Sequence, residues 1–246
     1  MRLEYQYVWL LWSSAFLVPW AVLFFARPAL RPHMVRVSAA TSLLGLTEPI
    51  FVPKYWNPPS LFDLAQRTGF DIESFVFCFA IGGIGSVLYN ALARRELHPV
   101  TAAERHSARH RLHALALMTP YFSFPLLYAL PWNPIYAGIA ALAIGATLNV
   151  LCRPELGRKT LLGGLLFLAL YAAFMVLLVV FAPGYVERVW NLAGLSGVLI
   201  AGIPLEELAF GFAFGTYWAG LYEHFSWRTA GAQATSLFAS SRGHHV

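Results

Sequence analysis

The sequence predicts an all-α membrane protein with about seven transmembrane helices. Hydrophobic residues make up 58% of the 246 residues and charged residues only 12%, a composition that indicates a polytopic membrane protein rather than a soluble domain. The chain is long enough for seven apolar helices of about 20 residues each, which is the length that crosses a bilayer. Uncharged apolar runs, separated by charged or proline-rich breaks, mark these helices along the chain.

The predicted spans follow one another from the N-terminus. They are roughly residues 5–25, 35–52, 70–93, 112–130, 135–151, 161–181 and 199–222. The first is too long and too aromatic for a cleaved signal peptide, so we retain it as a helix. Residues 192–203 are also uncharged, which leaves open an earlier start of the last helix and a deeper position for the acids that follow.

The distribution of positive charge predicts the orientation. Of the 17 Lys and Arg residues, 13 lie in the loops after the first, third and fifth spans or in the C-terminal tail, and 4 lie on the opposite side. Lys and Arg are retained on the cytoplasmic side. We therefore expect a multi-pass cell-membrane protein with its N-terminus outside and its C-terminus in the cytoplasm. Anchoring to anionic lipid explains the net charge of +5 without a nucleic-acid partner.

Two adjacent acids begin the last span. Pro204, Glu206 and Glu207 precede an otherwise uncharged apolar run. A charge in lipid is costly, so an acid inside a membrane helix indicates a functional site. Proline suits the first helical turn, where the helix dipole favours negative charge. The acids could equally serve only as caps at the lipid–water boundary.

An earlier stretch repeats this motif. Residues 71–77 align without a gap with residues 204–210, so that Glu73 matches Glu206 and Phe77 matches Phe210. Small residues also coincide further along, since Cys78, Gly82 and Ser86 fall on Gly211, Gly215 and Ala219. A small residue at every fourth position lets membrane helices approach closely. We infer a duplication.

The duplication predicts the domain organisation. Residues 1–95 and 132–228 form two three-helix repeats, residues 96–131 hold a linker with the fourth helix, and residues 229–246 form a disordered cytoplasmic tail. Joined directly, two three-helix units would be inverted, whereas the linker helix makes them parallel. Parallel repeats bring corresponding residues to one depth, where the two can share a site.

The sequence lacks the residues that several known types of cofactor site require. The lysines are Lys54 and Lys159, both in predicted loops, so the last span has no Schiff-base lysine for retinal. Membrane prenyltransferases need aspartate clusters for magnesium, but the aspartates are Asp63 and Asp71 alone. Residues 82–85 are glycine-rich within a predicted membrane helix, so they are no dinucleotide fingerprint. We predict no cofactor.

Three histidines have a spacing that a metal site would use. His106, His110 and His113 lie among arginines at a predicted cytoplasmic helix start. We interpret them as a solvated interfacial face and predict no metal. Cys78 and Cys152 are far apart in or beside apolar segments, so no disulfide framework is implied.

The remaining candidate for a functional site is the set of acids and aromatic side chains in the predicted membrane helices. At helical spacing Glu206, Phe210 and Tyr217 share one face, and Glu73 and Phe77 repeat its beginning, although such aromatic stripes more often serve packing. A buried carboxyl group tends to stay protonated, and two close carboxyl groups cannot both ionise cheaply. Aromatic faces stabilise a cation that has lost its water. A dry acid beside aromatic faces is what protonation of an alkene requires, because water must be kept from the carbocation.

Glu48 is a further candidate. It precedes Pro49 near the outer end of the second span. It lies either in the site or at a helix end that is exposed to water.

The motif at the last span resembles a known family. Pro204, Glu206, Glu207 and Phe210 match the Pro-x-Glu-Glu-x-x-Phe signature of the membrane-embedded lycopene cyclases, the heterodimeric type or its fused single-chain form. That family's unit is a three-helix domain, present as two subunits or as two copies in one chain. The first copy here departs from the signature: an aspartate replaces the proline, and Ser74 replaces the second acid. The stretch from Glu48 to Pro59 does not match the family pattern either.

The resemblance implies a cofactor-free lycopene β-cyclase-like isomerase, an intramolecular lyase. An acid protonates the terminal double bond of lycopene or a related linear polyene, the internal double bond attacks the tertiary cation, and loss of a ring proton leaves a β-ionone ring. The resemblance assigns proton donation to Glu206 with Glu73 as its counterpart and gives Glu207 the role of partner carboxyl or base. Because Glu207 points about 100° away from Glu206 on an α-helix, it could instead pack toward the Gly211 face and serve structure. The expected substrate contacts are Phe77, Phe210, Tyr217 and Glu48.

The expected partners are the polyene in the bilayer and membrane lipid, and a homodimer is left open. Two alternatives from another class remain. One is a non-catalytic membrane protein that binds a carotenoid or isoprenoid, which the degenerate first repeat favours. The other is a small transporter, although the first, fifth and sixth spans lack the polar residues that a transporter places at mid-membrane, apart from serine, threonine and asparagine.

Overall fold

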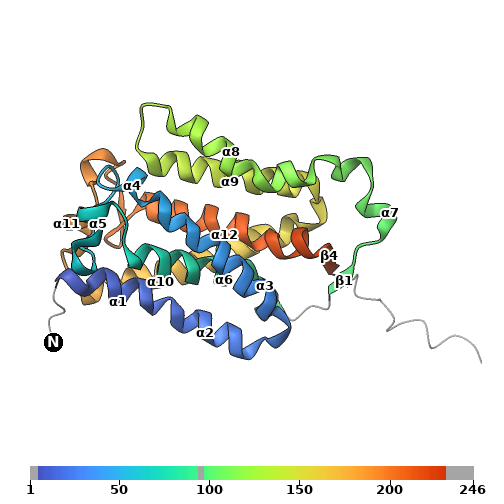
Figure 1. Ribbon diagram of the computed structural model, residues 1–246, viewed down its shortest axis with the longest axis horizontal. Helices are drawn as coiled ribbons and strands as arrows, with labels where there is room; N and C mark the ends of the chain where they lie inside the picture. Colours follow the sequence, from blue (N-terminus) through green and yellow to red (C-terminus); the bar gives the residue numbers. More distant parts are fainter. Residues whose placement is uncertain (1–4, 94–96, 231–246) are drawn as a thin grey trace, which may run out of the picture.

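A computed structural model describes residues 5–93 and 97–230. The long helices lie side by side along the longest axis of the molecule (Figure 1). They are α1 (Val8–Ala15), α2 (Leu17–Ala26), α3 (Arg31–Ser42), α6 (Ile72–Ala93), α8 (His113–Tyr128), α9 (Pro134–Cys152), α10 (Gly157–Phe181) and α12 (Leu205–Ser226). The all-α fold class is confirmed, since the strands among the described residues have only two or three residues each.

Short elements cover the two ends of the bundle. The end where α6 and α12 begin carries η1 (Tyr5–Tyr7), α4 (Glu48–Phe51), η4 (Leu61–Asp63), α5 (Leu64–Thr68), α11 (Tyr185–Val189), η7 (Leu192–Gly194), β2 (Leu199–Ile200) and β3 (Ile203–Pro204). The other end carries η2 (Pro28–Leu30), β1 (Leu97–Pro99), α7 (Ala102–Arg105), η5 (Ala108–Leu112), η6 (Pro154–Leu156) and β4 (Arg228–Ala230). Between α3 and α4, η3 (Leu43–Thr47) continues the helical path.

Four helical segments are long and apolar enough to cross a membrane. They are Tyr5–Ala26, Ile72–Ala93, Pro134–Cys152 and Pro154–Phe181, and they match the first, third, fifth and sixth predicted spans. The second, fourth and seventh predicted spans correspond to α3–η3–α4, α8 and α12. With its 16 residues α8 is about 24 Å long, less than the roughly 30 Å hydrocarbon core. The number of seven spans therefore stays a prediction.

The last helix begins later than its predicted span. Leu205 is the first residue of α12, and Pro204 precedes the helix with an extended ψ of 136°. The strands β2 and β3 form an antiparallel hairpin whose turn residues, Ala201 and Gly202, have φ angles of 52° and 80°. Both residues are left-handed, as a tight two-residue hairpin turn requires. An earlier start of the helix, within residues 192–203, is thus wrong.

Helices α6 and α12 begin and end in the same register. Each has 22 residues, and they start directly after Asp71 and Pro204, which the gapless alignment pairs. Asp71 caps its helix, since its Oδ1 accepts the backbone N–H of Ser74. The aspartate at the proline position therefore has a structural role of its own. The inferred repeat stays a prediction that this equal geometry favours.

The paired glycines of these helices lie at helix contacts. Gly82 of α6 faces Thr41 of α3, and Gly215 of α12 faces Phe167 of α10. In both places an added Cβ atom would overlap the neighbouring side chain. The small residues thus allow the close approach that the sequence predicts.

The strands β1 and β4 join the far ends of the two helices. They pair antiparallel, with Leu97 opposite Ala230. Residues 229 and 230 therefore belong to a strand rather than to the predicted disordered tail. The rest of that tail, residues 231–246, lies outside the described residues.

Candidate active site

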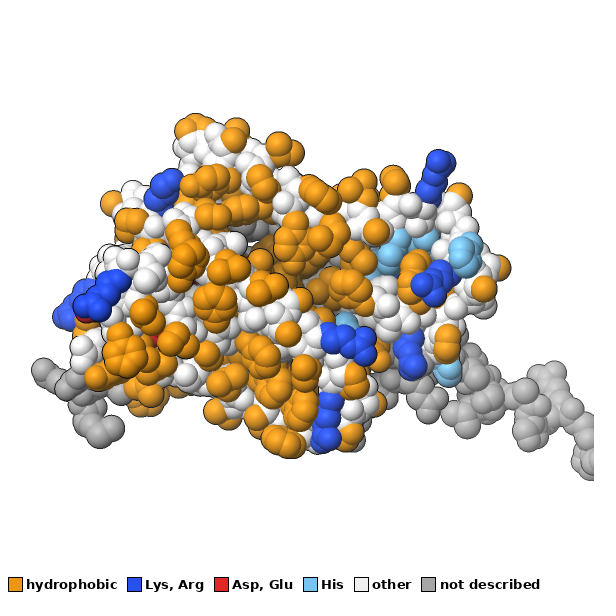
Figure 2. Space-filling model, viewed as in Figure 1, with side chains coloured by type: hydrophobic (Ala, Val, Ile, Leu, Met, Phe, Trp, Pro, Cys, Tyr) orange, Lys and Arg blue, Asp and Glu red, His pale blue; other side chains and the backbone are white. Residues whose placement is uncertain are grey.

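A cavity of about 300 Å³ lies toward the end of the bundle where α6 and α12 begin. Fifteen of the thirty described residues that line it are aromatic. They come from both predicted repeats and from α8, and the face in Figure 2 is hollowed below the α8–α9 hairpin. Among the described lining residues only Glu48 and Glu207 are ionisable acids, and there is no Lys, Arg or His.

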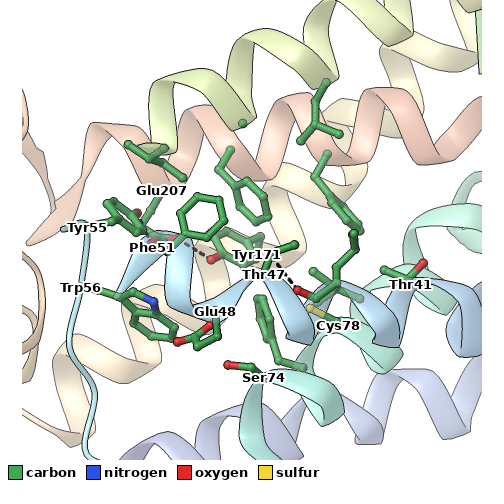
Figure 3. Close-up of a pocket in the computed structure, with 18 of the residues that line it drawn as sticks. Thr41, Thr47, Glu48, Phe51, Tyr55, Trp56, Ser74, Cys78, Tyr171 and Glu207 are labelled. Carbon is green, nitrogen blue, oxygen red and sulfur yellow. Dashed lines mark hydrogen bonds between the residues drawn. The ribbon is translucent and has the colours of Figure 1, made fainter. Parts of the chain in front are cut away.

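Glu207 is held by three hydrogen-bond donors. It lies in the first turn of α12 and is 5% exposed. The Tyr55 hydroxyl donates to its Oε1, the Trp190 Nε1–H donates to the same oxygen at 2.8 Å, and the Tyr171 hydroxyl donates to Oε2 (Figure 3). Three donors around two oxygens suit an ionised carboxylate, which only accepts.

Two loops place two of the three donors, Tyr55 and Trp190, beside Glu207. The backbone N–H of Asn57 donates to Val189 at 2.8 Å, and that of Asn191 donates to Tyr55 at 2.9 Å. These bonds connect the loop after α4 with the loop after α11. Because the loops belong to different predicted repeats, the surroundings of Glu207 require both halves of the chain.

Glu48 reaches the same cavity from α4. It is 7% exposed, so the alternative of a water-exposed helix end is wrong. Its side chain lies beside those of Ser74 and Trp56 (Figure 3). Its Oε1 and the Ser74 hydroxyl are buried without a hydrogen-bond partner among the described residues. An ionised carboxylate with an unpaired buried oxygen is costly, so this environment suits a neutral carboxylic acid.

The position of Ser74 relates Glu48 to the acid that the first copy of the motif lacks. Ser74 occupies in α6 the place that Glu207 occupies in α12, so the first predicted repeat lacks its second acid there. Glu48 brings a carboxyl group from the neighbouring α4 to that place. The cavity thus contains two acids although the motif is complete in only one repeat.

Glu206 and Glu73 do not line the cavity. The Oε1 of Glu206 accepts the backbone N–H of Ser196 at 2.8 Å and the Tyr136 hydroxyl at 2.7 Å. The Oε1 of Glu73 accepts the backbone N–H of Leu61 at 2.7 Å. Each acid therefore anchors the loop before its own helix. Their positions give no support to proton donation by Glu206 or to a counterpart role of Glu73.

The three predicted aromatic contacts do line the cavity. Phe77 and Phe210 flank Tyr171, with ring centroids 6.4 and 6.0 Å from it. Tyr217 lies further along, and its hydroxyl donates to the carbonyl oxygen of Leu117 in α8. Its ring therefore borders the cavity while its polar atom is already used.

The sequence reasoning missed the donors to Glu207. Tyr55 lies in the stretch that does not match the family pattern, which was a signal that this stretch differs. Tyr171 lies within an apolar run and Trp190 in a loop, so no local pattern connects them with an acid. Ser74 was treated as a lost acid, but it borders the cavity.

The histidine prediction is partly wrong. His106 is exposed, as a solvated face implies, but His113 is only 9% exposed and His110 is partly buried. Both contact Cys152 near the end of the bundle opposite the acid-lined cavity.

These features define a class of protein before any comparison. The chain is an all-α protein with four membrane-like helices and an aromatic cavity that contains two acids. Residues 133–225, which lie within the second predicted repeat, match the family model described as lycopene cyclase. This match supports membership of the lycopene cyclase family and a role in carotenoid cyclisation, and it fits a membrane protein. No curated protein and no solved structure matched the chain.

Proposed function

We propose that this protein is a membrane isomerase that closes the ends of lycopene, or of a related linear polyene, into β-ionone rings. The observation that carries the proposal is the pair of carboxyl groups, Glu48 and Glu207, in an otherwise apolar and aromatic cavity. A polyene offers no charge or hydrogen bond for recognition. An aromatic cavity is therefore a suitable binding site, and the two acids supply the chemistry.

The surroundings of the two acids suggest the role of each. Glu48, whose Oε1 is buried without a hydrogen-bond partner among the described residues, delivers its proton to the terminal double bond of the substrate. The π electrons of that bond form the new C–H bond and leave a tertiary cation. The internal double bond attacks this cation and closes a six-membered ring, which moves the positive charge into the ring.

Glu207 completes the reaction in this proposal. Its carboxylate removes a ring proton, and the electrons of that C–H bond form the ring double bond. The atoms and electrons of substrate and product are the same, so no oxidant or reductant is needed. Glu48 and Glu207 take over the roles that the family resemblance gave to Glu206 and Glu207. A proton must return from Glu207 to Glu48 between turnovers.

The surrounding rings favour the cationic intermediates. Tyr171 lies among Phe16, Phe77 and Phe210, with ring centroids 6.0 to 6.4 Å from its own. Aromatic faces attract a cation most strongly where water is excluded. An aromatic wall also keeps water from capturing the carbocation before the ring closes.

Pigment analysis of lycopene-producing cells tests this function. Expression of the chain should convert lycopene into products with β-rings, and Glu48→Gln should lower that conversion by a factor of about 10² to 10⁴ at an equal protein level, because the amide cannot donate as an acid. The exposed Glu187→Gln, on α11, is the matched control and should behave as wild type. Lycopene that copurifies with the protein without conversion would instead indicate a carotenoid-binding protein.

We also propose the predicted topology and assembly. The N-terminus lies outside and the C-terminus in the cytoplasm, with seven spans arranged as two parallel repeats, and a homodimer remains compatible with this. The equal lengths and starts of α6 and α12 support the repeat. A reporter that is active only in the periplasm should stay silent when fused after Val246. Activity of that reporter would reverse the orientation.

A further inference from the structure

A second cluster of reactive side chains lies at the opposite end of the bundle from the acids, and the proposed cyclisation does not use it. His110 lies in η5, His113 begins α8, and Cys152 ends α9. The Cys152 Sγ lies 3.4 Å from the His110 Nδ1 and 3.5 Å from the His113 Nδ1. All three atoms are within 4.8 Å of one another, and the side chains are buried or partly buried.

The distances to the sulfur suit a tetrahedral metal ion. Zinc binds sulfur at about 2.3 Å and imidazole nitrogen at about 2.0 to 2.1 Å, so a tetrahedron separates these ligand atoms by roughly 3.6 Å. The two N···S distances, 3.4 and 3.5 Å, are close to this edge length. The two ring nitrogens lie within 4.8 Å of each other, and the imidazole rings would approach each other to reach the N···N separation of roughly 3.3 Å around zinc.

The neighbours of His113 fix the ring in the form that binds a metal. Its Nε2 lies 3.2 Å from the carbonyl oxygen of His224, and a carbonyl oxygen can only accept. The proton must therefore be on Nε2, which leaves a lone pair on the Nδ1 that faces Cys152. A backbone carbonyl that holds the second ring nitrogen in this way is a usual partner of metal-binding histidines.

Without a metal ion, the thiol would donate to the His113 Nδ1 and the His110 Nδ1–H would donate to the sulfur. With a metal ion, the thiolate and the lone pairs of both nitrogens bind at once. The same three atoms therefore converge in the arrangement that a metal ion requires.

We propose that His110, His113 and Cys152 bind one Zn²⁺ ion, with the fourth position open to water or another small ligand. A thiolate and two imidazoles are ligands that zinc favours and that magnesium and calcium do not. The ion would join the linker helix α8 to the end of α9. Trp227, which follows α12, stacks on His113 with ring centroids 4.2 Å apart. The site would thereby tie the linker to the second predicted repeat.

Cobalt titration of the full-length protein, purified without a polyhistidine tag, tests this site. Co²⁺ is the probe because its bond to a thiolate gives a charge-transfer absorption that zinc lacks. The wild type should show this absorption with one ion bound per chain, and added Zn²⁺ should abolish it. Cys152→Ser should lose the absorption, and His110→Ala should weaken cobalt binding at least about tenfold.

His106→Ala is the matched control. This histidine lies four residues before His110 but is exposed and contacts the carbonyl oxygen of Ala102, so its loss should leave the titration unchanged. If Cys152→Ser does not fold, the partly buried His110→Ala decides. A wild type without the thiolate absorption, or a His110→Ala variant that binds cobalt as the wild type does, would overturn the proposal. Neither result depends on pigment conversion, so the test is independent of the cyclase proposal.

Discussion

The start of α6 matches the start of α12 in geometry but not in chemistry. Both helices have 22 residues, and both carry a glutamate in the second position that accepts a backbone N–H from the preceding loop. These are Glu73 and Glu206. The next residue differs, since Ser74 stands in α6 where Glu207 stands in α12. Both of these residues border the cavity.

Within the motif, one position has a structural role and the next position contributes to the cavity. The glutamate that both helices share anchors the preceding loop, and the residue that differs between them faces the cavity. In the first predicted repeat, Glu48 brings a carboxyl group to this place from a different helix. The two predicted repeats therefore each contribute one acid to the cavity.

The largest effect should come from Glu207. In lycopene-producing cells Glu207→Gln should lower ring formation by a factor of about 10² to 10⁴, since an amide cannot take up the ring proton. Protein levels should stay normal because the amide oxygen still accepts hydrogen bonds. Glu206→Gln is the neighbouring control and should retain most activity, because its amide oxygen can accept from Ser196. Loss of activity in Glu206→Gln alone would reverse the two roles.

The glycines test the equivalence of the helices through packing. Gly82→Leu and Gly215→Leu should each lower the free energy of unfolding by about 1 to 3 kcal/mol or more, because a side chain would overlap Thr41 or Phe167. Thermal unfolding in detergent measures this. Gly138→Leu is the control, since its nearest neighbour, Phe51, is 4.0 Å from an added Cβ. Normal stability of both test variants would mean that the glycine pairing is accidental.

The loop-anchoring acids should matter for stability more than for chemistry. Glu206→Ala and Glu73→Ala each remove the acceptor of a backbone N–H, which should lower the free energy of unfolding by about 1 to 3 kcal/mol. The glutamine variants should restore most of it. Thermal unfolding of the four variants compares the two helices directly. Unchanged stability in both alanine variants would contradict an anchoring role.

The smallest effect should come from Ser74. Ser74→Ala removes a neutral hydroxyl that lies beside Glu48 in the cavity wall. A neutral hydroxyl that hydrogen-bonds to Glu48 during the reaction is worth about 0.5 to 1.5 kcal/mol, so ring formation should fall by no more than roughly tenfold. Ser86→Ala in the same helix is the control, because its hydroxyl donates to Gly83 and lies outside the cavity wall. Equal pigment profiles for both variants would remove Ser74 from the site.

Composition and local pattern were sufficient for the general architecture. The predicted positions of the first, third, fifth and sixth spans agree with membrane-like helices, because apolar length is a property of contiguous residues. The Pro-x-Glu-Glu motif pointed to the helix that carries the acid in the cavity, and residues 133–225 match the lycopene cyclase family. The alignment of α6 with α12 also predicted two equal helix starts.

The tertiary structure decided which side chains act together. Glu206 and Glu207 are neighbours in sequence but point about 100° apart on a helix, so only the packing of α12 determines which one meets the cavity. Tyr171 and Trp190 meet Glu207 from other elements. His110 and Cys152 are 42 positions apart. Such long-range contacts depend on how helices pack, which no local periodicity encodes.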